Sequence, residues 1–155
     1  MKKVFFYNYP IGWIGIAEEN GAISRVVFAG NDKNNFNGFA EAETPLIKKA
    51  AAQLTEYFAG KRKDFILPLA PVGTEFQRSV WRALQTVPYG ETRSYGDIAV
   101  MIGNPKAPRA VGMANNRNPI VVIIPCHRII GHDGSLTGYG GGLNVKQYLL
   151  DLEKR

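Results

Sequence analysis

The segment Ile-Val-Val-Ile-Ile-Pro-Cys-His-Arg-Ile-Ile, residues 120–130, joins a strongly apolar run to three reactive or chargeable side chains. Its five leading apolar residues, rich in β-branched side chains, predict a buried strand or strand-like segment. Pro125 should then hold the backbone extended and end any strand ladder. We therefore expect Cys126 to be held rigidly in one place. His127 and Arg128 follow it directly, and both groups can lower the pKa of a thiol and favour a thiolate nucleophile.

An ordinary structural role for this cysteine has to be weighed against a chemical one. Cys126 is the only cysteine of the chain, and a free cysteine at the end of an apolar run is commonly a small buried hydrophobe. His127 and Arg128 favour chemistry, because two chargeable groups directly after a buried run are costly unless they are solvated or paired.

The composition is that of an ordinary soluble protein. The chain has 155 residues, 45% of them hydrophobic and 21% charged, which allows one good core or two small ones. A single cysteine excludes a disulfide within the chain and fits a reducing compartment. Asn8 and Pro10 interrupt the short apolar patch at the N-terminus, so we expect neither a signal peptide nor a membrane span and predict a cytoplasmic protein.

The positive charge points to an anionic partner. The net charge is +6, and residues 98–132 contain no carboxylate. The cations of this window are Lys106, Arg109, Arg117 and Arg128. Such a window favours phosphate contact, although scattered solvated lysines and arginines can also produce one.

The first part of the chain, residues 1–71, predicts a small α/β domain. The strand-like runs are residues 4–9, 12–18 and 22–29, with a weaker one at 65–69. Asn20-Gly21 predicts a hairpin and therefore an antiparallel sheet. Residues 30–43 predict a loop, after which Thr44-Pro45 should begin a helix that Gly60 ends.

The second part, residues 72–155, predicts helices with short connections. Capping boxes at Thr74 with Gln77 and at Ser94 with Asp97 should open two helices, and a third is expected over 107–116. Two short helices joined by a tight connection form a helix-turn-helix, although a structural αα-hairpin is the more common outcome; Arg109, at the start of the second helix, favours DNA binding. Residues 131–142 contain six glycines, which predicts a tightly turned or mobile loop before a last helix capped by Asn144.

Several ordered motifs of this second part resemble the O6-alkylguanine-DNA alkyltransferase family. They are Pro125-Cys126-His127-Arg128 after the β-branched run, Asn118-Pro119 before it, and Ser94-Tyr95-Gly96-Asp97-Ile98-Ala99. The resemblance extends from Thr74 to Glu153, whereas the first domain matches only in its general pattern. It implies an α+β protein in which a ribonuclease H-like domain with a small antiparallel sheet precedes a helical, winged helix-turn-helix-like domain.

The resemblance also implies roles for particular residues in a DNA-repair reaction. Cys126 would accept a methyl group from O6 of guanine, with His127 as its base through a water and Glu153 orienting that histidine. Tyr95 would give a proton to the departing guanine. The DNA contacts implied are Arg109 as the finger that replaces the flipped nucleotide, with Ala110, Gly112, Asn116, Arg117, Asn118 as a hinge, and Arg128. The base pocket implied is Tyr95, Asn118, Val121, Tyr139 and Gly140.

The chemistry that the family performs calls for these residue types. A guanine oxygen lies inside the base stack, so the nucleotide must be flipped out, and a thiolate is a suitable nucleophile for an alkyl carbon. The thioether product is not readily reversed, so each molecule should act once. The implied partner is double-stranded DNA carrying O6-alkylguanine, bound through its minor groove by a monomer. No cofactor is implied, and the first domain lacks the Cys and His residues for the structural zinc of some relatives.

Three other functions remain open from the sequence. A non-catalytic module that recognises alkylated DNA would share most motifs, although such relatives lack the cysteine. A Cys-His hydrolase would need a glycine-flanked elbow or a separated Cys and His pattern, neither of which is visible. A plain helix-turn-helix regulator would leave Pro125-Cys126-His127-Arg128 without a role. The preference for larger alkyl groups and the acceptance of O4-alkylthymine are also open.

Overall fold

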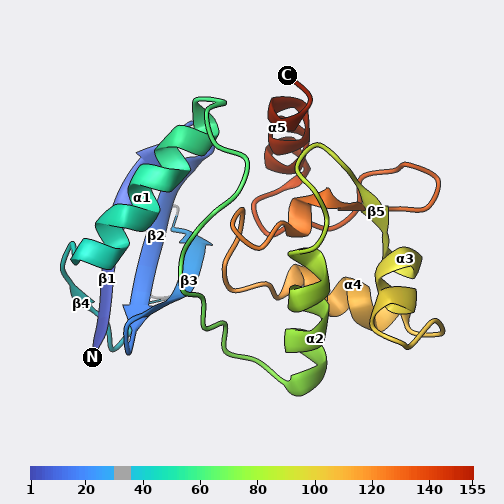
Figure 1. The fold of residues 1–155 in the computed structure, drawn as a ribbon, viewed down its shortest axis with the longest axis horizontal. Coiled ribbons are helices and arrows are strands. Elements are labelled where there is room, and N and C mark those ends of the chain that lie inside the picture. Colours follow the sequence, from blue (N-terminus) through green and yellow to red (C-terminus); the bar gives the residue numbers. More distant parts are fainter. Residues whose placement is uncertain (30–35) are drawn as a thin grey trace. The chain divides into compact units, whose positions relative to one another are not determined.

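The computed structural model describes residues 1–29 and 36–155, and its internal contacts divide the chain into Met1–Pro71 and Val72–Arg155 (Figure 1). The first unit contains a sheet and one helix, and the second is mainly helical. The predicted α+β class, a small sheet domain followed by a helical domain, is confirmed. Among the described residues, no helix has the length and apolar character needed to cross a membrane.

The sheet of the first unit has the strand order β3-β2-β1-β4. Its long strands are β1 (Lys2–Tyr9), β2 (Gly12–Glu19) and β3 (Ala22–Phe28). The predicted Asn20-Gly21 hairpin is confirmed, with φ of 52° and 79° at the two turn residues, which is the combination a type I′ turn requires. This hairpin joins β2 to β3 as an antiparallel pair, and β2 also pairs antiparallel with β1.

The predicted sheet was wrong in one respect, because it is mixed rather than purely antiparallel. Within the segment expected to be a loop, β4 (Ala40–Glu41) pairs parallel with β1, Lys3 opposite Ala40. A two-residue edge strand has no periodic pattern from which it could be recognised. The expectation for residues 30–35 lies outside the described residues. The weak strand predicted at 65–69 is reduced to one isolated bridge between Leu69 and Ile23.

One helix, α1 (Pro45–Phe58), covers a face of this sheet (Figure 1). The predicted start is confirmed, because the Thr44 side chain accepts a hydrogen bond from Ile47 N at 3.1 Å and Pro45 follows it. Gly60 directly follows the C-cap and has φ of 74°. The buried side chains of the helix and the sheet form the core of this unit: Ile14, Ile16, Ile23, Ile47, Leu54 and Tyr57.

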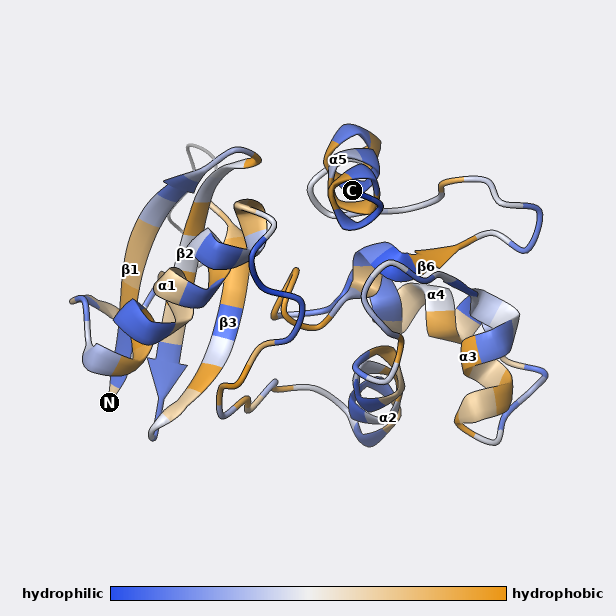
Figure 2. Cartoon of the chain, turned by 45° about the horizontal axis from the view of Figure 1, so that its top comes forward, coloured by the Kyte–Doolittle hydropathy of each residue, from blue (hydrophilic) through white to orange (hydrophobic). Residues whose placement is uncertain are grey.

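The second unit contains four helices among the described residues and a two-stranded parallel ladder of β5 with β6. The elements are α2 (Glu75–Leu84), β5 (Arg93–Ser94), α3 (Tyr95–Met101), α4 (Pro108–Asn116), β6 (Ile129–Ile130) and α5 (Leu143–Glu153). Both predicted capping boxes are confirmed, at Thr74 with Gln77 and at Ser94 with Asp97. In Figure 2, α2 alternates hydrophobic and hydrophilic residues around its axis, and its apolar side buries Val80, Trp81 and Leu84.

The strand predicted before the cysteine was wrong. Residues 120–124 are buried as expected, but they form tight turns closed by hydrogen bonds from Ile124 N to Ile120 O and from Ile123 N to Val121 O. Val122 has φ of 70°, which is rare for a β-branched residue and implies local strain of about 1–3 kcal/mol. Pro125 is likewise not part of an extended strand, since it precedes the 3₁₀ turn Cys126–Arg128.

The predicted cap of the last helix was also wrong. α5 begins at Leu143, and its N-cap is Gly142, with φ of 94° and no side-chain cap. Asn144 therefore lies inside the first turn. A capping asparagine and one inside the first turn look alike in the sequence, because glycine is also accepted as an N-cap.

Candidate active site

Cys126 lies in a tight turn, and side-chain hydrogen bonds hold the turns before it in place. Cys126 begins the 3₁₀ turn Cys126–Arg128, and its side chain is almost fully buried, with 4% exposure. Asn118 bridges the preceding turns, because its Nδ2 donates to Ile124 O at 2.7 Å and its Oδ1 accepts from Ile120 N at 3.0 Å. Cys126 is thus held in place as expected, but by turns and the hydrogen bonds of Asn118 and not by a strand.

His127 contacts Glu153 through one of its two ring nitrogens. Nε2 lies 2.7 Å from Glu153 Oε2, and both side chains are buried. A carboxylate can only accept, so Nε2 carries the proton and Nδ1 keeps a lone pair. Burial lowers the pKa of His127, outweighing the opposing effect of Glu153. Among the described residues no protein group bonds Nδ1, so this nitrogen is available as a base.

Arg128 has a structural role in the site. It is buried, and its Nε and Nη2 donate to the two oxygens of Glu153 at 2.8 and 3.1 Å while Nη1 donates to Val87 O at 2.8 Å. The expectation that Arg128 contacts DNA is therefore corrected, because its donors already bind protein groups in the interior. From the sequence, buried His127 and Arg128 were expected to need polar partners. The carboxylate of Glu153 is the partner of both.

The resting thiol is strongly disfavoured as a thiolate. Burial raises the pKa of Cys126 to about 11, although a hydrogen bond from Asn118 and the charge of Lys146 both act to lower it. The sequence suggested that His127 and Arg128 would lower this pKa. The structure instead gives that effect to Asn118 and to Lys146, which lies twenty residues along the chain.

Lys146 is the functional candidate that sequence reasoning missed. Its side chain is fully buried in α5, and Nζ donates to the backbone oxygens of Ile129 and of Thr137, the latter at 2.8 Å. Burial lowers its pKa, and the charge of Cys126 opposes that shift. Helical spacing could have revealed it, because Lys146 lies seven residues before Glu153 and therefore on the same face of α5.

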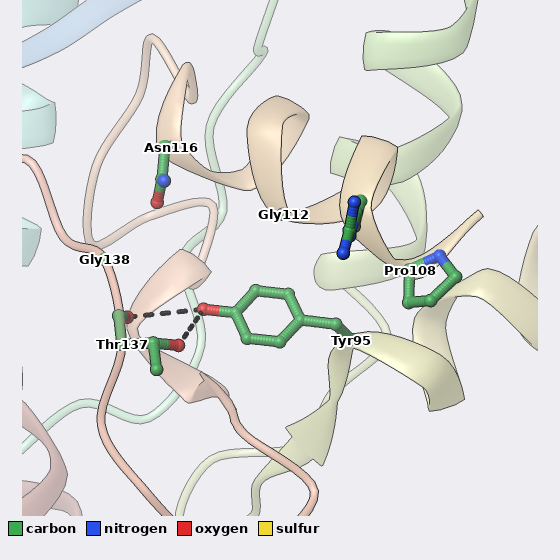
Figure 3. A pocket seen from close by; sticks show the side chains of 7 residues that line it. Tyr95, Pro108, Gly112, Asn116, Thr137 and Gly138 are labelled. Carbon is green, nitrogen blue, oxygen red and sulfur yellow. Dashed lines mark hydrogen bonds between the residues drawn. The ribbon is translucent and has the colours of Figure 1, made fainter.

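The second unit also has an open pocket of about 350 Å³, and one of its lining residues, Thr137, accepts a hydrogen bond from Lys146 (Figure 3). Its lining comes from α3, from α4 and from the loop before α5: Tyr95, Pro108, Arg109, Gly112, Asn116, Thr137 and Gly138. In Figure 3 the Tyr95 ring extends from α3 between Gly112 and the loop. Its hydroxyl lies 2.7 Å from Thr137 Oγ1 and 3.3 Å from Thr137 O.

The predicted pocket residues are only partly brought together. Tyr95 lines the pocket with Arg109, Gly112 and Asn116, which were expected to contact DNA. The other four predicted pocket residues do not line it: Asn118, Val121, Tyr139 and Gly140. Tyr139 nevertheless belongs near the thiol, because burial of its hydroxyl raises its pKa and the charge of Cys126 adds to that effect.

The outward face of α4 is suited to contact a nucleic acid. Its exposed residues are Pro108, Arg109, Ala110, Met113, Asn116 and the following Arg117. Met113, which is 65% exposed, was not predicted. Arg109 and Arg117 carry positive charge at the two ends of this face, while Ala110 allows close approach.

Two known domain families match the chain. The 6-O-methylguanine DNA methyltransferase ribonuclease-like domain matches residues 3–71, and the DNA binding domain of the same methyltransferase matches residues 75–155. The chain belongs to the 6-O-methylguanine DNA methyltransferase family. This confirms the resemblance drawn from its second part and extends it to its first.

Relatives in the 6-O-methylguanine DNA methyltransferase family match almost the whole chain. The methylated-DNA–protein-cysteine methyltransferase of Methanosarcina acetivorans is 52% identical over 148 residues, 95% of each chain. The constitutive enzyme of Bacillus subtilis is 48% identical over 150 residues, covering 94% of this chain and 91% of the relative. The crystal structure of Mycobacterium tuberculosis OGT in complex with DNA is 45% identical, with a TM-score of 0.91 over 98% of this chain and 92% of that one.

Proposed function

We propose that this protein repairs DNA by transferring an alkyl group, above all methyl, from O6 of guanine to the sulfur of Cys126. The observation that carries this proposal is the buried Cys126–His127–Glu153 arrangement, in which the carboxylate leaves one histidine nitrogen free to act as a base. The product is a thioether, so each molecule acts once. O4 of thymine is a second alkylated oxygen to which the same chemistry extends.

In the proposed reaction, His127 Nδ1 takes the Cys126 proton through a water while Glu153 stabilises the imidazolium that forms. The thiolate attacks the alkyl carbon, the carbon–oxygen bond breaks, and its electron pair stays on the guanine. Tyr95 gives its proton to the departing base. Because burial holds the pKa of Cys126 at about 11, the resting thiol is protected from other electrophiles and needs this base to react.

The proposed DNA contact is the exposed face of α4, placed in the minor groove. Arg109 already lines the pocket, so it can leave the pocket and fill the gap in the stack when a flipped nucleotide enters. Ala110, Gly112, Asn116 and Arg117 then lie along the groove. Arg128 is excluded from this set because it is buried on Glu153.

The remaining predicted residues surround the nucleophile in this proposal. Asn118 and Val121 belong to the buried turns before Cys126, where Asn118 acts as the hinge between α4 and the thiol. Tyr139 and Gly140 do not line the open pocket, but in this proposal they contact the flipped base from the Gly-rich loop when it reaches Cys126. We further propose that the protein acts as a cytoplasmic monomer, since repair of one lesion needs one copy of the site.

Intact-protein mass spectrometry after mixing with duplex DNA that carries one O6-methylguanine tests this function. We expect a gain of one methyl group per protein on the peptide that contains Cys126, and no gain in Cys126→Ser. Tight lesion binding without a mass change would support the alternative, a recognition module without transfer. Methylation that persists in Cys126→Ser would exclude Cys126 as the acceptor.

The role of Arg109 is tested by comparing two substrates. Arg109→Ala should slow transfer from duplex DNA far more than transfer from free O6-benzylguanine, because only the duplex requires flipping. Arg82→Ala, which removes an exposed arginine of α2 outside the pocket, is the matched control and should leave both rates unchanged. Equal losses on both substrates in Arg109→Ala would remove the finger role.

A further inference from the structure

The hydroxyl group of Tyr95 contacts two oxygen atoms of a single residue. Thr137 Oγ1 lies 2.7 Å from it and the Thr137 backbone oxygen 3.3 Å from it (Figure 3). The two oxygens differ in chemistry, because a backbone carbonyl can only accept a hydrogen bond whereas a threonine hydroxyl can also donate one. Thr137 can therefore bind Tyr95 both as a phenol and as a phenolate.

Thr137 is exposed and lines the pocket. Contacts from two helices, α5 and α4, nevertheless hold this part of the loop in position. From α5, Lys146 Nζ donates to the Thr137 backbone oxygen at 2.8 Å. From α4, Asn116 lies so close to Gly138 that an added Cβ there would be 2.9 Å from the amide atoms. The threonine is thus anchored between a buried ammonium and a tight helix–loop contact.

After Tyr95 donates its proton, its oxygen needs a hydrogen-bond donor, and among the contacts of the described residues the threonine hydroxyl is the one placed to provide it. Once the phenolic proton has left, the tyrosine oxygen is a pure acceptor, and the Thr137 carbonyl 3.3 Å away becomes a repulsive neighbour. The hydroxyl at 2.7 Å can turn its hydrogen toward the same oxygen. A hydrogen bond to a charged oxygen is stronger than one to a neutral oxygen.

We propose that Thr137 is a positioning residue for proton transfer, whose hydroxyl donates to the Tyr95 oxygen as the phenolic proton passes to the departing guanine. The inference rests on the proposed alkyl transfer and deepens it. The Tyr95 O–H bond breaks as the proton joins the base that has kept the electron pair of the broken carbon–oxygen bond. The resulting phenolate accepts from Thr137 until water returns a proton to it.

The test is a double-mutant cycle on the single-turnover rate of methyl transfer, with Thr137→Val and Tyr95→Phe made separately and together. Thr137→Val keeps the shape and removes the hydroxyl, so we expect transfer to slow by about 10- to 150-fold, the value of one hydrogen bond to a charged group. Thr137→Ser keeps a hydroxyl and should restore most of the rate. In the Tyr95→Phe background, Thr137→Val should cause no further loss.

A matched control separates the hydroxyl's role from general effects of the substitution. Thr55→Val removes a hydroxyl that bonds Ala51 O in α1 and should leave transfer unchanged. Thr137→Ala gives a second hydroxyl-free variant, and urea unfolding verifies that each variant is folded. Should Thr137→Val not fold, the same cycle is read with Thr137→Ala.

Three outcomes distinguish failure of the inference from failure of the proposed function. If wild-type protein gains no methyl group, the alkyl transfer and this inference both fall. If wild type reacts but the loss in Thr137→Val is equally large with Phe at position 95, Thr137 acts independently of Tyr95 and only the inference falls. An unchanged rate in Thr137→Val would also overturn it.

Discussion

Glu153→Gln should destabilise the second unit more than any surface change of the same kind. The Glu153 carboxylate is buried and accepts from Arg128 Nε and Nη2, from His127 Nε2 and from Gly90 N. The amide removes the negative charge, so the buried Arg128 guanidinium loses its counter-ion. Breaking a buried pair in this way costs about 3–5 kcal/mol, which in a chain of this size lowers Tm by roughly 6–20 °C.

Glu91→Gln provides the matched control. Glu91 pairs with Arg93 at 3.1 Å, a distance close to that of Glu153 with Arg128, but at the surface of the same unit. An exposed pair contributes about 0–1 kcal/mol. The two substitutions remove the same chemical group, so the difference between them measures the effect of burial.

Urea unfolding followed by the fluorescence of Trp81 measures both variants. Trp81 is buried in the second unit, whereas Trp13 is half exposed in the first, so a Trp13→Phe background restricts the signal to the unit in question. If Glu153→Gln lowers the free energy of unfolding by no more than Glu91→Gln does, the carboxylate does not hold Arg128 as described. The reasoning from burial and pairing would then be refuted.

Two further predictions concern the thiol and the buried ammonium. Burial raises the pKa of Cys126 to about 11, so the unfolded chain ionises first and the thiol's contribution to stability is lost as pH rises from its ordinary value toward 11. The free energy of unfolding of wild type in urea should therefore fall relative to that of Cys126→Ser by about 1.4 kcal/mol per pH unit over this range. Free energies of unfolding that change with pH in parallel for the two proteins would contradict this. Lys146→Met strips a donor from the backbone oxygens of Ile129 and Thr137, so it should cost about 1–3 kcal/mol of stability and slow methyl transfer. The exposed Lys154→Met should do neither, and equal effects from both would refute the role of the buried ammonium.

The high pKa of the resting thiol has a functional consequence. Burial raises the pKa of Cys126 to about 11, so under the proposed function the thiol is shielded from small electrophiles that would consume a protein acting only once. In the proposed reaction the thiol depends on the neighbouring base, His127, whose Nδ1 is left available by the hydrogen bond from Nε2 to Glu153. Under that proposal, selectivity comes from the need for both the DNA substrate and the histidine base before the thiol can react.

Much of this protein could be predicted from local sequence alone. The hairpin at Asn20-Gly21 and the capping boxes at Thr74 and Ser94 depend on residues within four positions of one another, and all three were confirmed. The motif around Cys126 was sufficient to indicate the family, because ordered motifs at matching spacing are far more specific than a single cysteine. Structural features that depend only on residues close together in the chain can therefore be predicted from the sequence.

The tertiary structure decided what depends on contacts between distant segments. The apolar run 120–124 predicts burial correctly, yet only packing made it a set of turns instead of a strand, since periodicity cannot distinguish the two. Arg128 looked like a phosphate ligand until Glu153, 25 residues away, was found to bind it. Lys146 gained its place near Cys126, and Thr137 its place at Tyr95, through folding of the glycine-rich loop. Burial and electrostatic interactions between distant residues set these roles, and neither can be read from residues that are adjacent in the sequence.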